Sequence, residues 1–335
     1  MATDNTLIEV NNLNVGFRFG DEYYNAVEDV SISLAKNEIL AIVGESGCGK
    51  STLATAIIGL HDPHNTRIEG EILYNGLDLT KLNEKLYNRL RGNDISMIFQ
   101  DPLGSLNPVM TIYKQIEESL IYHTKLNDKE RYDRVLELLN QVGIPKPERV
   151  MKQYPHELSG GMRQRVVIAI ALANKPPVII ADEPTTALDV TIQAQILDLM
   201  KDIQEETESG IILITHDLGV VAETADRVAV MYAGQIVEEA PVDVLFTDPK
   251  HPYTRSLLNS IPNELHEDGE ELHVIQGTVP SLQNLPRKGD RFRDRIPWIP
   301  DEAFDEDPIL HEIAPGHKVR GNSWKYFHFE GEEME

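Results

Sequence analysis

A glycine-rich segment between an apolar run and a helix-forming run holds the residues of this chain best suited to bind phosphate. The segment, GESGCGKST at 44–52, fits G-x-x-x-x-G-K-[ST] residue for residue. Its glycines let several backbone N–H groups face one phosphate chain, and the helix that begins at Lys50 adds the positive end of its dipole. Lys50 can reach the β- and γ-phosphates, and the Ser51 hydroxyl can bind Mg²⁺. The predicted nucleotide-binding residues are Gly44, Glu45, Ser46, Gly47, Cys48, Gly49, Lys50, Ser51 and Thr52.

Two adjacent acids, Asp182 and Glu183, follow a second apolar run at 178–181. Asp182 can hold Mg²⁺ through water, and Glu183 can orient or deprotonate the water that attacks a γ-phosphate. Acid pairs at strand ends also serve as helix caps or solvated turns. The phosphate loop earlier in the chain favours the catalytic interpretation, because open α/β sheets bind ligands at the carboxyl ends of their strands.

The segment LSGGMRQR at 158–165 places Ser159 and two glycines directly before an apolar helix. Alone it indicates an ordinary N-cap, although N–H groups exposed at a helix start also bind anions. Together with the phosphate loop and the acid pair, it resembles the signature sequence of the ABC ATPases. In that family two ATPase domains pair head to tail and enclose ATP between the phosphate loop of one and the signature of the other. The resemblance implies that ATP held by another chain is contacted by Ser159, Gly160, Gly161 and Met162.

The remaining motifs of that family occur in order. Gln100 matches the Q-loop glutamine, which contacts Mg²⁺ or water and responds to the membrane partner. Asp189, in ALD at 187–189, matches the D-loop that crosses the dimer interface, and His216 matches the switch histidine near the γ-phosphate. The resemblance therefore implies a catalytic set and a Mg²⁺ set, which are Glu183, His216 and Gln100 for catalysis and Ser51, Gln100 and Asp182 for Mg²⁺.

Aromatic residues near the N-terminus are candidates to stack on adenine, as an aromatic residue in this region commonly does in the family. Phe19 and Phe17 are the first candidates, followed by Tyr23 and Tyr24. The length of this segment leaves the register open, and each of these rings could equally belong to the core.

Hydrophobic periodicity places these motifs on the elements of an α/β fold. Alternating patterns predict short strands at 7–10, 14–19, 30–34 and 70–76. Helical patterns at 112–120 and 132–139 predict a helical insertion over about 102–170. Continuous apolar runs at 178–181 and 211–214 predict buried parallel strands that flank a helix at 191–206, and a hairpin is predicted at 228–231 and 235–238.

The resemblance implies that this pattern of elements forms the ABC ATPase domain of the P-loop NTPases. It implies a RecA-like parallel core, an N-terminal antiparallel β subdomain and a helical subdomain. We expect this domain to span 1–262. A composition rich in proline, glycine and charge predicts a small irregular C-terminal extension at 263–335 rather than a second core.

Further segments narrow the resemblance to oligopeptide and dipeptide importers, and it then covers about 7–325. They are QDPLGSLNP at 100–108, HPYTRSLL at 251–258, GTVPSL at 277–282 and GHKV at 316–319. The resemblance implies a second, homologous ATPase chain in a heterodimer, two transmembrane permease subunits and an extracellular peptide-binding protein. It also implies a peripheral position on the cytoplasmic face of the cell membrane. Nickel importers have similar sequences, so import of nickel or of another solute stays an alternative to peptide import.

One departure from this subgroup concerns cysteine. Its extension often carries four cysteines that bind an iron–sulfur cluster, whereas this chain has one cysteine, Cys48 in the phosphate loop. We therefore expect ATP and Mg²⁺ as cofactors and no iron–sulfur cluster. Side-chain packing and partner contacts must then hold the extension, with Trp298, Trp324 and the turn at 280–282 as the expected anchors.

Composition argues against several other classes of function. The chain has 335 residues and a formal net charge of −24, which argues against nucleic acid as a partner. We expect neither a secretory signal nor a membrane-spanning helix, since no apolar run approaches the roughly 18–20 residues required. A non-transport ABC ATPase of DNA repair or translation is disfavoured by this acidity and by the single cassette. A kinase or GTPase is disfavoured by the signature segment.

Overall fold

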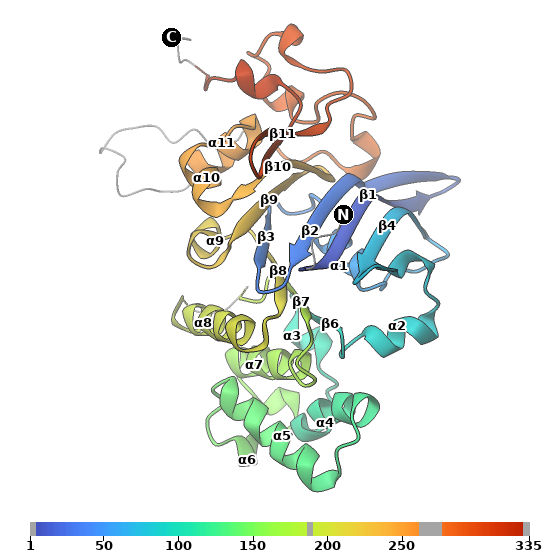
Figure 1. The fold of residues 1–335 in the computed structure, drawn as a ribbon, viewed down its shortest axis with the longest axis vertical. Coiled ribbons are helices and arrows are strands. Elements are labelled where there is room, and N and C mark those ends of the chain that lie inside the picture. The colour runs from blue at the N-terminus through green and yellow to red at the C-terminus, as the bar shows by residue number, and fades with distance from the viewer. Residues whose placement is uncertain (1–4, 186–189, 261–276, 331–335) are drawn as a thin grey trace.

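The computed structural model describes residues 5–185, 190–260 and 277–330, except the side chains of Leu103 and Val190. Figure 1 shows a central sheet region, a helical region below it and the C-terminal residues above it. The strands are β1 Thr6–Phe19, β2 Glu22–Ala35, β3 Ile39–Val43, β4 Thr66–Tyr74, β5 Leu77–Asp78, β6 Ile95–Ile98, β7 Val178–Asp182, β8 Gly210–Thr215, β9 Arg227–Tyr232, β10 Gln235–Pro241, β11 Leu310–Ala314 and β12 His317–Arg320. The α-helices are α1 Lys50–Ile57, α2 Glu84–Leu90, α3 Pro102–Ser105, α4 Ile112–His123, α5 Asp128–Gln141, α6 Pro147–Val150, α7 Gly160–Ala171, α8 Val190–Thr207, α9 Leu218–Thr224, α10 Val242–Thr247 and α11 Pro252–Asn259.

The core is a sheet in the order β11-β12-β10-β9-β3-β8-β7-β6, in which the strands from β9 to β6 run parallel. Every residue of β3, β7 and β8 is buried. Side chains on both faces of these strands therefore face apolar layers, which explains their uninterrupted apolar sequence. The predicted parallel core, including the helix between β7 and β8, is confirmed. The predicted hairpin is also confirmed as β9 and β10.

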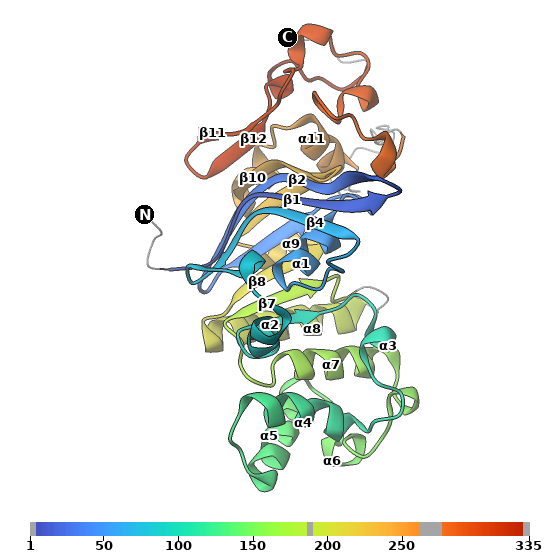
Figure 2. The same ribbon diagram turned by 90° about the vertical axis from the view of Figure 1, so that its right-hand side faces the viewer.

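A second sheet, in the order β2-β1-β4-β5, is antiparallel and lies beside the core sheet (Figure 2). The prediction of three short strands before residue 35 is wrong, because β1 and β2 are two long strands. Shifts in the pairing register, such as the one between Val10 and Leu13, carry β1 past polar residues that interrupt the alternating pattern. The C-terminal end of β1 carries Phe17, whose ring contacts His61 beside helix α1.

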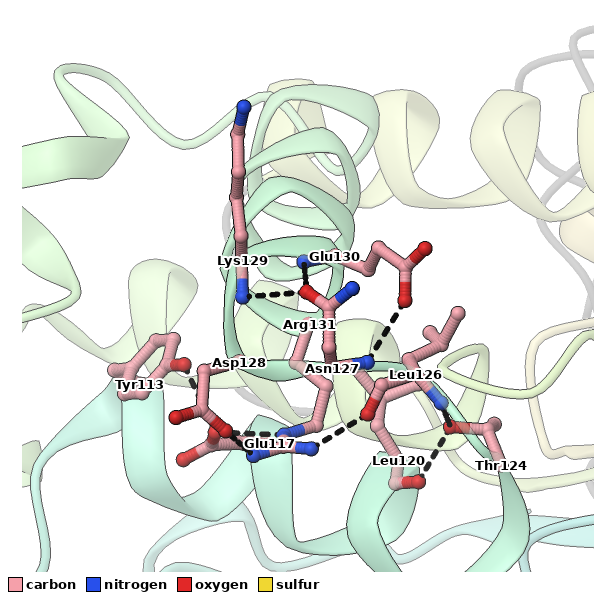
Figure 3. Close-up of polar contacts among 10 residues, drawn as sticks. All are labelled: Tyr113, Glu117, Leu120, Thr124, Leu126, Asn127, Asp128, Lys129, Glu130 and Arg131. Carbon is pink, nitrogen blue, oxygen red and sulfur yellow. Dashed lines mark hydrogen bonds and ion pairs between the residues drawn. The ribbon is translucent and has the colours of Figure 1, made fainter.

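The helical region contains α4, α5, α6 and α7, as predicted for the segment 102–170. A polar network fixes the turn between α4 and α5 (Figure 3). Asn127 and Glu130 form a reciprocal capping box at the start of α5. From α5, Arg131 donates to Glu117 of α4 at 2.9 Å, and Glu117 also accepts a hydrogen bond from the Tyr113 hydroxyl. The two helices are thereby locked into one rigid hairpin.

The described part of the C-terminal extension, residues 277–330, is irregular but not a separate appendage. Its strands β12 and β11 continue the core sheet beyond β10, and its buried Phe292 and Ile296 belong to the same apolar core as β7 and β8. The expected anchors are only partly right. Trp298 packs against that core and donates to the His328 carbonyl, whereas residues 280–282 are at most half-buried. Phe292, which is 1% exposed, anchors the extension more deeply.

Candidate active site

The phosphate loop connects β3 to α1, as the sequence predicts. Gly44 and Gly49 have φ values of 154° and 110°, and a β-carbon at either would collide with the backbone, 2.1 Å from the Met231 carbonyl oxygen or 2.5 Å from the Ala26 carbonyl oxygen. Gly47, with φ of 80°, instead faces open space. The loop is thus closely packed at its base and open at its tip, where a phosphate chain could approach the backbone.

Lys50 lies at the start of α1, is 5% exposed and folds back over the loop. Its ammonium donates to the carbonyl oxygens of Gly44 at 2.7 Å and Glu45 at 3.0 Å. It also lies 3.7 Å from the Cys48 sulfur, and burial raises the pKa of that thiol. Both carbonyl bonds can be exchanged for bonds to phosphate oxygens. Among the described residues, Lys50 forms no ion pair with an acidic side chain, so its charge is available to the predicted phosphates.

Asp182 ends β7 and is 5% exposed. Burial raises the pKa of its carboxyl, although the Ser51 side chain and the Lys50 charge act in the opposite direction. Its Oδ1 is buried without a hydrogen-bond partner among the described residues. A buried carboxylate oxygen with an open coordination position suits a hard cation such as Mg²⁺. The residues therefore fit the predicted metal.

Protein side chains alone do not form a complete metal cage here. Within the described ranges, no group of three or more His, Cys, Asp or Glu side chains could hold a metal ion. Mg²⁺ ordinarily keeps several waters and takes its other ligands from phosphates, so a single carboxylate and a hydroxyl are a sufficient protein contribution.

Three predicted catalytic side chains meet at the carboxyl ends of β6, β7 and β8. Gln100 donates from its amide nitrogen to Glu183 Oε2 at 2.7 Å. His216 Nδ1 lies 3.4 Å from Glu183 Oε1. The structure therefore brings Gln100, Glu183 and His216 together around one carboxylate, as expected for residues that handle one water molecule.

The backbone at Glu183 explains how the carboxylate is aimed. Glu183 has φ of 47°, a left-handed conformation that is unusual for a residue with a side chain, and its N–H donates to the Ile214 carbonyl at 2.9 Å. Such conformations concentrate at functional sites. The turn separates the two acids, so that Asp182 stays buried while Glu183 reaches Gln100 and His216.

The signature residues begin helix α7. Ser159 caps it, accepting from the Met162 N–H at 3.3 Å, and both Ser159 and Gly160 are exposed. Farther along α7, the buried Gln164 donates to the Pro184 carbonyl at 2.6 Å. The helix that carries the signature is thus tied to the loop directly after Glu183. Sequence reasoning did not single out Gln164.

The aromatic candidates lie where β1 ends and β2 begins in the antiparallel sheet. Phe17 packs edge-to-face on His61 with ring centroids 5.6 Å apart, and His61 in turn bonds the Thr52 carbonyl of α1. Phe19 is 45% exposed and contacts Tyr24 instead. Phe17 is therefore the candidate connected to the phosphate-loop helix. The predicted D-loop residue, Asp189, lies outside the described residues.

Sequence reasoning missed two residues that bind Glu45 of the phosphate loop. The Tyr253 hydroxyl of α11 accepts from the Glu45 N–H at 2.8 Å, and Arg295 of the extension donates to the Glu45 carboxylate at 2.6 Å. Tyr253 lies in the HPY segment, which the sequence marks only as a subgroup feature. No local pattern signals the role of Arg295.

Comparisons with known proteins agree with this geometry. A family model described as "ABC transporter" matches residues 27–186, and one described as "Oligopeptide/dipeptide transporter, C-terminal region" matches residues 237–298. The oligopeptide transport ATP-binding protein OppD of Lactococcus lactis subsp. cremoris is 52% identical over 335 residues, which cover 100% of this chain and 98% of that protein. The oligopeptide transport ATP-binding protein AppD of Bacillus subtilis is 52% identical over 316 residues, which cover 94% and 96%.

Solved structures show the same fold. A dimeric, post-hydrolysis structure of the ATP-binding cassette MJ0796 bound to ADP and Pi superposes with a TM-score of 0.65 at 31% identity, covering 70% of this chain and 99% of that one. The 52% identity to OppD extends over the whole chain and is high enough to show the family. The chain therefore belongs to the ABC transporter ATP-binding proteins, among those of oligopeptide and dipeptide transporters.

Proposed function

We propose that this chain, an ATPase that energises peptide import, hydrolyses ATP with Glu183 as the base. The observation that carries the proposal is the meeting of Gln100, Glu183 and His216 at the strand ends beside the phosphate loop. Glu183 would accept a proton from the attacking water, Gln100 would orient the carboxylate, and His216 would contact the γ-phosphate. Lys50 would bind the β- and γ-phosphates through the ammonium that now rests on the loop carbonyls.

We further propose that Asp182, Ser51 and Gln100 hold Mg²⁺, with Asp182 acting through water. The open Oδ1 of Asp182 supports this assignment. When bound, Mg²⁺ supplies positive charge that offsets the negative charge of the triphosphate. Phe17 is our preferred residue for stacking on adenine, since its contact with His61 places it beside α1.

The site is proposed to be completed by a second chain. Ser159, Gly160, Gly161 and Met162 would contact ATP bound to the partner, and Asp189 would cross the interface. The exposed start of α7 supports this role, because its N–H groups and dipole favour an anion that this chain's own loop does not supply. By analogy with two-chain peptide importers, the partner is a homologous ATPase, which gives a heterodimer.

Coupling to two permease subunits is proposed to run through the surface next to Gln100. Phe99 is 38% exposed and Val109 is 80% exposed, so apolar side chains on either side of α3 are available to a partner. In the described part of the chain, no helix is both long and apolar enough to cross a membrane. By analogy with peptide importers, the proposed location is peripheral, on the cytoplasmic face, with a peptide-binding protein acting on the opposite face.

The domain division is a proposal as well. An ATPase domain at 1–262 and an extension at 263–335 place the boundary after α11, within a segment outside the described residues. The pairing of β10 with β12 means that the two parts would share one sheet.

A transport experiment tests the function directly. The chain would be assembled with its permeases and binding protein in vesicles loaded with ATP and Mg²⁺, and uptake of labelled peptides would be measured. We expect peptides to be imported and to stimulate ATP hydrolysis. Uptake of Ni²⁺ without uptake of peptides would instead assign the chain to nickel import.

A further inference from the structure

The phosphate loop contains an acid that should oppose its own ligand. Glu45 is the second residue of the loop, and its carboxylate would repel a triphosphate unless its charge is compensated. The compensating charge comes from far along the chain. Arg295 Nη1 lies 2.6 Å from Glu45 Oε2, and its Nη2 lies 3.3 Å from Oε1. The two side chains thus form a bidentate ion pair.

This ion pair is partly shielded from water. The Arg295 side chain is 6% exposed, and that of Glu45 is 28% exposed. The guanidinium also lies over two aromatic rings, 5.7 Å from the centroid of Tyr232 and 5.6 Å from that of Phe292. An arginine held in this way keeps a fixed direction and a stronger interaction than an exposed surface pair.

The backbone of Glu45 is held from the same side. Its N–H donates to the Tyr253 hydroxyl at 2.8 Å. The ring of Tyr253 packs against Tyr232, at a centroid distance of 4.6 Å, and against Phe292, at 5.5 Å. Tyr253 therefore holds the main chain of Glu45, and Arg295 holds its side chain. The buried rings of Tyr232 and Phe292 pack against both of them.

Glu45 also contacts Lys50, the residue proposed to bind phosphate. The Glu45 carbonyl accepts from the Lys50 ammonium at 3.0 Å. A displacement of Glu45 would therefore move one of the groups that hold Lys50 over the loop. Arg295 itself contacts Glu45, Gly277 and the aromatic cluster.

We propose that Arg295 is a positioning residue for ATP, through which the C-terminal extension sets the affinity of the phosphate loop. It neutralises Glu45 and fixes the loop conformation in which Lys50 meets the phosphates. The inference rests on the proposed ATP site and adds to it a requirement for the extension.

The test uses the full-length chain and compares Arg295→Ala with Arg293→Ala. Arg293 lies on the same short 3₁₀ turn, Arg293–Arg295, but pairs with Asp301 inside the extension at 2.7 Å. The dissociation constant for ATP would be measured by calorimetry, and KM and kcat by phosphate release. We expect Arg295→Ala to raise the dissociation constant and KM about tenfold, the size of one lost charge-assisted hydrogen bond, with kcat within about twofold. Arg293→Ala should change none of them.

Two further variants separate positioning from folding. Arg295→Lys keeps the charge and should recover part of the affinity. Combining Arg295→Ala with Glu45→Gln removes the uncompensated charge and should restore the dissociation constant to within about threefold of the parent. Both tryptophans, Trp298 and Trp324, lie in the extension, so an unchanged emission spectrum would show that it remains docked.

The outcomes are distinct. Equal ATP affinity in Arg295→Ala and the parent would overturn the proposal, as would an equal loss in Arg293→Ala. A double variant as weak as Arg295→Ala would show that Arg295 does not act through Glu45. Absence of ATP binding by the parent chain would count against the proposed function rather than against the role of Arg295.

Discussion

The Gln100 amide and the Glu183 carboxylate are joined by a hydrogen bond of 2.7 Å between side chains 83 positions apart. The bond links the residue that leads into the exposed α3 region with the proposed catalytic base. Under the proposed coupling, movement of a permease at that surface would reach Glu183 through Gln100. This contact connects the proposed permease surface with the proposed catalytic base.

Replacing Glu183 with Gln should separate binding from hydrolysis. The Gln oxygen can still accept from Gln100, so the geometry is retained, but a neutral amide cannot take a proton from water. We expect ATP affinity to stay within about threefold and turnover to fall by at least about 100-fold. Phosphate release and ATP binding would be measured together, with Glu148→Gln on an exposed helix as the control. Turnover within tenfold of the parent would remove Glu183 from the catalytic role.

Replacing Asp182 with Asn should raise stability while abolishing activity. Because burial raises the pKa of Asp182, the neutral acid favours folding at low pH, and this contribution is lost as pH rises through that pKa. At pH 7 the buried carboxylate is a net cost that Asn avoids. We expect a gain of about 1 kcal/mol, or about 2 °C in Tm, without Mg²⁺. A lower Tm, or normal Mg²⁺-dependent turnover, would contradict the assignment.

Replacing Ser159 with Asp tests the composite site without loss of the helix cap. Asp caps a helix as well as Ser does, so α7 should remain stable, but its charge would repel the phosphate of the partner's ATP. The variant would be combined either with Lys50→Ala on the same chain or with replacement of the matching phosphate-loop lysine of the partner chain. One active site should survive when the changes are on opposite chains, and none when they share a chain. The reverse pattern would place Ser159 at its own loop.

Motifs that lie within a few residues of one another could be predicted from the sequence alone. The phosphate loop, the acids at the end of β7 and the histidine after β8 depend on a local strand-to-loop pattern, so residue types and spacing were sufficient to locate them. The contact between Glu45 and Arg295 could not be predicted, because its partners are 250 positions apart and an arginine carries no sign of its partner.

Buried polar residues also made part of the core sheet difficult to predict from the sequence. The sequence predicts no strand at β12, where His317 pairs with the buried Glu238 at 2.8 Å and Arg320 pairs with Asp29. These partners give hydrogen bonds and opposite charges to groups that burial removes from water. Since hydrophobic periodicity does not register such pairs, the sequence indicated an irregular appendage where the structure continues the core sheet.

His251 provides a pH-dependent test of how the extension is anchored. Burial lowers the pKa of this fully buried imidazole below its ordinary value of 6.5, although Asp290 and Glu238 raise it in part and Arg320 lowers it further. Its Nδ1 accepts the Tyr253 N–H, which requires that nitrogen to be unprotonated. The unfolded chain therefore binds a proton more readily than the folded chain does, and stability should fall as pH drops below about 6.5.

We expect the free energy of unfolding, followed by tryptophan emission in urea, to decrease by up to about 1 kcal/mol through His251 between pH 7.5 and 5.5. His251→Asn keeps a side-chain acceptor at the N-cap of α11 and should remove that part of the pH dependence. The exposed His64→Asn serves as the control and should leave it unchanged. If His251→Asn and the parent lose equal stability on acidification, the imidazole does not control the anchoring of the extension, and the acid sensitivity must be assigned to other buried groups.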